Sequence, residues 1–142
     1  DMHGINNTHG HDFGDAYLAA TAHALHQVTA PNDLVARLGG DEFLVITATG
    51  PDRLAAALDR ALTAPVRIGG RQILLAASAG ICPIGGGPAH VALGRADRAM
   101  LRAKRQRAIT AIWNPAEDGE PPPAGTRPTR RVRDQHRHTT GR

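Results

Sequence analysis

The stretch that organises this chain reads Arg37-Leu38-Gly39-Gly40-Asp41-Glu42-Phe43. Strand-like apolar runs flank its Gly-Gly-Asp-Glu centre at residues 34–38 and 43–47. Because glycine accepts the positive φ angles of tight turns, two such runs around a glycine-led turn predict a β-hairpin. The glycines also leave room for a ligand against the backbone, and two adjacent acids follow them at the hairpin tip.

Outward from this hairpin, helical segments alternate with strand-like ones. Apolar periodicity or Ala- and Leu-rich composition predicts helices at residues 15–28, 52–64 and 89–105. A second hairpin is expected from strands at residues 66–68 and 71–75, the latter running on to Ile81, with a last strand at residues 108–113. Loops or turns are predicted at residues 1–14, 30–33 and 83–88. This order predicts an α+β fold in which helices cover a mainly antiparallel sheet.

The length of 142 residues fits one domain with one hydrophobic core. After Asn114 the chain is mostly Pro, Arg, His and Thr, and it cannot bury enough apolar surface to offset its ordering entropy. We therefore expect a folded domain at residues 1–113 and a disordered tail at residues 114–142. Cys82 is the single cysteine, so an internal disulfide is excluded, and no His/Cys grouping has zinc-like spacing.

The two acids at the hairpin tip are the first candidates for chemistry. Adjacent carboxylates repel each other, so both stay ionised most easily beside a cation or hydrogen-bond donors. Their oxygens suit Mg²⁺, which usually arrives with substrate phosphates and can polarise them. On Asp41 and Glu42 alone, a solvated turn whose acids have no role is an equally good interpretation.

Two further motifs, one before and one after the hairpin, favour a functional role for the acids over a solvated turn. The first reads Asn6-Asn7-Thr8-His9-Gly10-His11-Asp12-Phe13-Gly14-Asp15 and precedes a helix. The second is Ser78-Ala79-Gly80-Ile81, followed by Ala96-Asp97-Arg98-Ala99-Met100-Leu101-Arg102-Ala103-Lys104. Together with the Gly-Gly-Asp-Glu-Phe stretch, these ordered segments resemble the GGDEF family of diguanylate cyclases from residue 5 to about 113. The resemblance implies a bacterial second-messenger enzyme that condenses two GTP into cyclic di-GMP and releases pyrophosphate.

The resemblance also implies roles at the hairpin tip. Asp41 and Glu42 match the catalytic acids that hold the metal, Mg²⁺ or Mn²⁺. Gly39 and Gly40 match the backbone that passes close to GTP.

Three matching positions outside the hairpin are implied to bind substrate. Asn6 and Asp15 match residues that hydrogen-bond guanine, for which an amide and a carboxylate are chemically suited. Lys104 matches a lysine that contacts the terminal phosphates. Without the resemblance, Asn6 would be interpreted as a turn residue, Asp15 as a helix N-cap and Lys104 as a solvated charge at a helix end.

The chain departs from the family pattern in three places. The family's first metal-binding Asp, on a preceding strand, would lie upstream of residue 1, so this stretch is expected to lack one metal ligand and a central strand. The product-inhibition motif Arg-x-x-Asp reads Ala30-Pro31-Asn32-Asp33, which predicts no strong inhibition through that site. The phosphate-binding arginine that follows Lys104 in the family is matched by Arg107 only if one residue has been deleted.

Three functions are compatible with these residues. A cyclase would use GTP and act as a homodimer, and an upstream sensor or regulatory domain is expected. A degenerate domain would bind GTP or a protein partner without turnover. Nucleic-acid binding by the Arg-rich tail is the least favoured, because the tail lacks interleaved aromatics, so no specific nucleic acid is expected. No apolar run reaches the roughly 20 residues of a membrane helix, and no signal peptide is recognised, which favours a cytoplasmic domain of a parent protein that could be anchored upstream.

Overall fold

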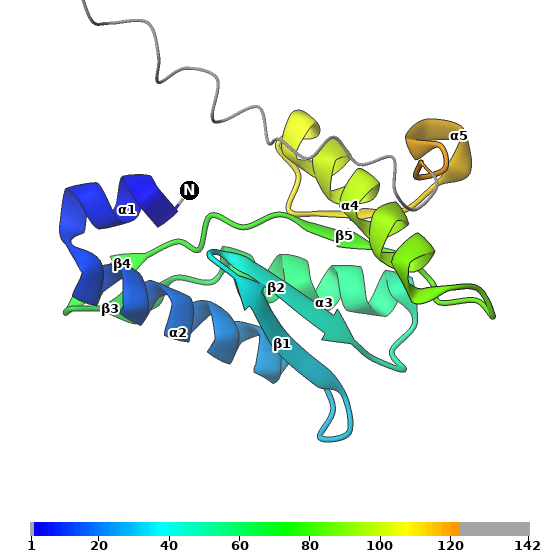
Figure 1. The fold of residues 1–142 in the computed structure, drawn as a ribbon. Coiled ribbons are helices and arrows are strands. Elements are labelled where there is room, and N and C mark those ends of the chain that lie inside the picture. The colour runs from blue at the N-terminus through cyan, green and yellow to red at the C-terminus, as the bar shows by residue number, and fades with distance from the viewer. Residues whose placement is uncertain (1, 123–142) are drawn as a thin grey trace, which may run out of the picture.

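A computed structural model describes residues 2–122, which form helices and two-stranded β-ladders (Figure 1). The helices are α1 (Met2–His9), α2 (His11–Gln27), α3 (Pro51–Thr63), α4 (Ala89–Gln106) and α5 (Pro115–Asp118). The strands are β1 (Leu34–Gly39), β2 (Glu42–Ile46), β3 (Val66–Ile68), β4 (Arg71–Ile73), β5 (Ala79–Ile81) and β6 (Thr110–Ile112). The mixed content confirms the predicted α+β class.

The first segment is helical, so the loop predicted at residues 1–14 is wrong. Helix α1 packs on α2, and its Met2 and Ile5 contact the main core, as does Phe13. Gly10, at φ 87°, separates the two helices and is the N-cap of α2. Helix α2 therefore starts four residues before Asp15, which is not its N-cap.

The hairpin around the Gly-Gly-Asp-Glu turn is confirmed. Strands β1 and β2 pair antiparallel, with Val35 opposite Val45 and Arg37 opposite Phe43. Val35, Phe43 and Val45 pack against the main core, which fixes one face of the hairpin. The tip is thereby held by a half-buried base while its own residues stay exposed.

The second hairpin, β3–β4, is also confirmed, and Gly69 and Gly70 both have positive φ at its turn. The expected continuation of its second strand to Ile81 is wrong. Strand β4 ends at Ile73, and the Ala76 N–H donates to the Tyr17 hydroxyl of α2 at 2.6 Å. Strand β5 then pairs parallel with β6, because helix α4 carries the chain back between them.

Two apolar clusters hold these elements together. The main core joins α2, α3 and the strands, and α3 contributes Leu54, Leu58 and Leu62. A smaller cluster joins Ala99 and Ala103 of α4 to Ala111 of β6. None of the described helices has the length and apolar content needed to cross a membrane.

The chain beyond β6 folds back along α4. Residues 115–118 form α5, and Asp118 is buried. The expectation of disorder from residue 114 onward is therefore wrong for residues 114–122, because ion pairs to α4 hold this segment. The rest of the predicted tail, residues 123–142, lies outside the described residues.

Candidate functional site

The turn at the tip of the β1–β2 hairpin has an open backbone. Gly40 has φ 55°, and an added Cβ at Gly39 or Gly40 would meet no atom within 4 Å. The Arg37 guanidinium closes the turn, since its Nε and Nη2 donate to the Gly40 carbonyl at 3.0 and 2.7 Å. The result is a fixed turn with space beside two adjacent glycines, as close approach of a ligand requires.

Asp41 and Glu42 follow directly and are both exposed. Within residues 2–122 no group of three or more His, Cys, Asp or Glu side chains could hold a metal ion. Two adjacent carboxylates nevertheless fit Mg²⁺, which is commonly held by one or two carboxylates while phosphates and waters complete its shell. The donor set thus fits a substrate-completed cation and does not fit an all-protein metal cage.

Asn6 lies on the side of α1 that faces α2. Its Oδ1 is buried and has no hydrogen-bond partner among the described residues. A Cβ at Gly14 would overlap this oxygen, so glycine is what lets the two helices approach. Asp15 follows Gly14 on α2 and is exposed. The contact between α1 and α2 therefore places the unpaired Asn6 Oδ1 beside Gly14. The exposed Asp15 carboxylate belongs to the next residue of α2.

Lys104 lies in the last turn of α4 and is exposed. Within the described part of the chain its side chain makes no hydrogen bond or ion pair. Arg107 ends the helix in the left-handed conformation at φ 55°, and the Ala108 N–H then donates to the Ala103 carbonyl at 2.9 Å. The turn is thus well defined, and a cation there is favoured by the helix dipole.

The predicted site residues come from three parts of the fold. Asn6 and Asp15 lie on the α1–α2 pair, the glycines and acids on the hairpin that packs against α2, and Lys104 on α4, which packs on β5 and β6. In the view of Figure 1, α1 lies above and to the left of the hairpin tip, and the C-terminal end of α4 lies above and to its right.

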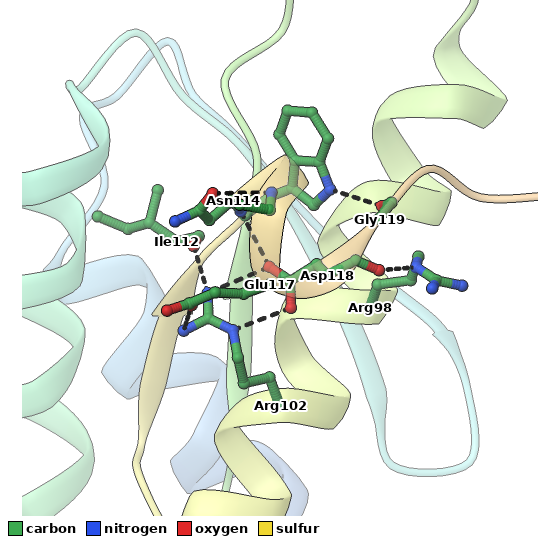
Figure 2. A network of polar contacts seen from close by, with 9 residues as sticks. Arg98, Arg102, Ile112, Asn114, Glu117, Asp118 and Gly119 are labelled. Carbon is green, nitrogen blue, oxygen red and sulfur yellow. Dashed lines mark hydrogen bonds and ion pairs between the residues drawn. The ribbon is translucent and has the colours of Figure 1, made fainter.

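Sequence reasoning missed two groups of residues around these positions. One is Arg37, which locks the turn, although its place inside the motif could have pointed to it. The other is the set of ion pairs between α4 and residues 113–121, which join residues far apart in sequence; the pairs made by Arg102 are drawn in Figure 2.

Asp33, the acid of the motif that lacks its arginine, has a local structural role. Its carboxylate accepts from the Ala30 N–H at 2.7 Å and the Ala48 N–H at 3.4 Å. Hydrogen bonds from the Thr47 side chain and then from Ala30 lower the pKa of Asp33. This carboxylate thus joins the turn after α2 to the end of β2.

Comparison with known families is decisive for residues 2–109, which match the family described as "Diguanylate cyclase, GGDEF domain". The chain belongs to the GGDEF domain family. The resemblance read from the three motifs is thereby confirmed, as is the expected fold. The match covers most of the helices and strands described above and ends near the start of β6.

Individual curated relatives are similar over about the same length of this chain. The chain is 41% identical over 107 residues to an uncharacterised 19.3 kDa protein of Streptomyces ambofaciens, covering 70% of this chain and 56% of that protein. It is 36% identical over 108 residues to MucR of Pseudomonas aeruginosa, described as a bifunctional diguanylate cyclase and cyclic di-GMP phosphodiesterase, covering 72% and 16%. The chain therefore spans only part of these curated relatives.

Among solved structures, the isolated GGDEF domain of TpbB (YfiN) from Pseudomonas aeruginosa is similar, with a TM-score of 0.70 and 34% identity. The similarity covers 80% of this chain and 71% of that one. Both the motifs and the fold of the chain are thus those of a GGDEF domain.

Proposed function

We propose that this GGDEF domain is a diguanylate cyclase that condenses two GTP molecules into cyclic di-GMP. In each half-reaction the 3′-hydroxyl oxygen of one GTP attacks the α-phosphorus of the other. A new P–O bond forms, the bond to pyrophosphate breaks, and the hydroxyl proton is lost. Two such steps close the ring and release two pyrophosphates.

The observation that carries this proposal is the intact pair Asp41 and Glu42 beside an open Gly39-Gly40 backbone. A degenerate signature would be expected to have lost one of these acids or the glycines. Here both acids are present, the turn is fixed by Arg37, and the space at the glycines is unfilled.

Each proposed site residue has a role in binding metal, guanine or phosphate that suits its side-chain chemistry. Asp41 and Glu42 hold the divalent cation, Mg²⁺ or Mn²⁺, which when bound neutralises phosphate charge and helps ionise the attacking hydroxyl. Asn6 and Asp15 orient guanine, the carboxylate accepting from N1–H and the amino group. Lys104 binds the terminal phosphates as a point charge.

The chemistry also implies a partner copy. One domain that holds one GTP has only half of the reactants, so catalysis needs a homodimer whose two sites face each other. We propose that the dimer contacts, a sensor or regulatory domain and the missing first metal ligand are supplied by the parent protein outside this stretch. The domain is proposed to act in the cytoplasm, where GTP is available, and to have no specific nucleic-acid partner.

A regulatory GTP-binding module is the second candidate. One observation favours it: the described residues offer two adjacent carboxylates and no larger metal-binding group. MucR, whose description pairs the cyclase with a phosphodiesterase, illustrates the setting in which such a module would act.

The experiment that separates these candidates is incubation of the parent protein, including the segment expected upstream of residue 1, with GTP and Mg²⁺. Chromatography detects cyclic di-GMP, and GTP binding is measured in parallel. Product from the parent and from Asp52→Asn, an exposed acid on α3, but none from Glu42→Ala supports the cyclase. GTP binding without product in all three proteins supports the regulatory module and refutes the cyclase.

A further inference from the structure

Residues 113–121, here called the C-terminal strap, run along one side of α4 (Figure 2). At the strap's start, Trp113 Nε1 donates to the Gly119 carbonyl at 3.2 Å, and Asn114 Oδ1 caps α5 by accepting from the Ala116 N–H at 3.0 Å. At its end Pro121 lies against Gly94 of α4, where a Cβ would come within 2.7 Å of the proline ring. The strap is therefore folded on itself and seated on the helix.

The centre of the strap is Asp118, whose side chain is 0% exposed. Its Oδ1 accepts from Arg102 Nε at 2.9 Å, and its Oδ2 accepts from Arg102 Nη2 at 3.1 Å and from the Asn114 N–H at 2.9 Å. Arg102 Nη2 also donates to the Ile112 carbonyl at 2.7 Å, and its Nη1 pairs with Glu117 at 2.8 Å. One guanidinium thus joins α4, β6 and α5.

The basic residues of α4 differ in whether they bind the strap. Arg95, Arg98 and Arg102 lie at spacings of three and four, on one side of the helix, and all three bind the strap. Arg95 pairs with Glu120 through two 2.9 Å hydrogen bonds and lies 4.3 Å above the Trp113 ring. Lys104 lies in the last turn, outside this stripe, and stays exposed.

The strap is the second of two supports for α4. On another side the helix lies against β5, where Gly80 approaches the Ala96 and Met100 backbone and a Cβ would overlap it. Ala99 and Ala103, both 0% exposed, pack against Ala111 of the neighbouring β6. With packing on one side and the Arg102–Asp118 pair on the other, the direction of the last turn of α4 is fixed.

We propose that Asp118 is a positioning residue for Lys104: by holding Arg102, it sets the helix end from which Lys104 meets the terminal phosphates of GTP. This inference rests on the proposed function of the site. Asp118 itself touches no substrate. Its loss moves the helix end, and displacement of a binding group by about 1 Å is enough to weaken its contribution strongly.

The test is a double-mutant cycle in the parent protein. The ligands are 3′-deoxy-GTP, which lacks the attacking hydroxyl and cannot react, and GMP, which lacks the terminal phosphates. We expect Asp118→Asn to weaken 3′-deoxy-GTP binding about tenfold, with GMP binding changed less than about twofold. In a Lys104→Ala background the same substitution has no further effect. Glu120→Gln, at the exposed end of the strap, is the matched control and leaves both affinities unchanged.

Two results overturn the positioning role: equal weakening of GMP and 3′-deoxy-GTP, or an undiminished effect in the Lys104→Ala background. If Asp118→Asn does not fold, Arg102→Lys makes the same comparison. Lysine keeps the positive charge but lacks the guanidinium group, which contacts Asp118 and β6 at the same time. A wild-type protein that binds neither nucleotide refutes the proposed function itself, and the positioning role with it.

Discussion

Replacing Gly80 by alanine tests the packing that supports α4. Gly80 lies in β5, where an added Cβ would overlap the Ala96 carbonyl oxygen and the Met100 amide nitrogen and lie 2.9 Å from the Ala96 carbonyl carbon. All three atoms belong to the helix backbone, so no side-chain rotation relieves the overlap. Strand and helix must separate, which also loosens Ala99 and Ala103.

The expected magnitude follows from two opposing effects. Overpacking a close contact costs about 1–3 kcal/mol, and the backbone overlap here places Gly80→Ala at the upper end, about 3 kcal/mol. The substitution also restricts the unfolded chain, which offsets about 0.4–1 kcal/mol. We therefore expect a net loss of about 2 kcal/mol in the free energy of unfolding, which lowers Tm by about 8 °C in a domain of this size.

Urea unfolding followed at Trp113, the single tryptophan, measures this loss. Gly85→Ala is the matched control, because it restricts the unfolded chain in the same way and an added Cβ there meets no atom within 4 Å. Gly80→Ala should be less stable than this control by about 3 kcal/mol. Equal stability of the two variants would show that β5 and α4 are not packed as described.

Three further predictions concern other contacts. The pKa of Asp118 is lowered, chiefly by its hydrogen bonds from Arg102. The ionised Asp118 therefore stabilises the folded state fully above the unfolded pKa of about 4, and this stabilisation is lost as the pH falls through the lower folded pKa. The free energy of unfolding should therefore fall less steeply below about pH 4 in Asp118→Asn than in wild type, and identical profiles would contradict this pairing. Tyr17→Phe removes the acceptor of the Ala76 N–H and should cost about 1 kcal/mol in urea unfolding; an unchanged midpoint would contradict that bond. Cyclic di-GMP should not bind strongly at residues 30–33, where the Asp33 carboxylate already holds the turn; tight binding in calorimetry that Asp33→Ala abolishes would refute this.

The parts of the fold that the sequence predicts correctly are those decided by neighbours in the chain. Both hairpins follow from glycine pairs between apolar runs, and α3 follows from its leucine stripe. Helix α1 was missed because Gly4 and polar residues hide the two apolar positions that contact the core. The end of β4 was missed because the partner of the Ala76 N–H is Tyr17, 59 residues away.

The same distinction explains the candidate site. The motifs predict the candidate residues at the hairpin turn and at the end of α4, because each motif is a short, continuous stretch whose residue types suit a particular chemistry. The anchoring of residues 114–122 could not be predicted, since an Asp in a proline-rich segment has no local sign of its partner. Asp118 and Arg102 are 16 residues apart, and only the fold brings them together.

Apart from Asn6, whose Oδ1 is buried, the side chains proposed to touch substrate differ in burial from the residues that hold them in place. Asp15, Asp41, Glu42 and Lys104 are exposed, so substitutions there should change binding or chemistry with little effect on stability. Their supports make close or buried contacts: Gly14 beneath Asn6, Gly80 beneath α4, and Asp118 beside Arg102. Substitutions at these supports should reduce stability and function together. A GGDEF domain that keeps its signature acids but loses such supports would then retain the motif without the geometry, which is one physical route from a cyclase to a regulatory module.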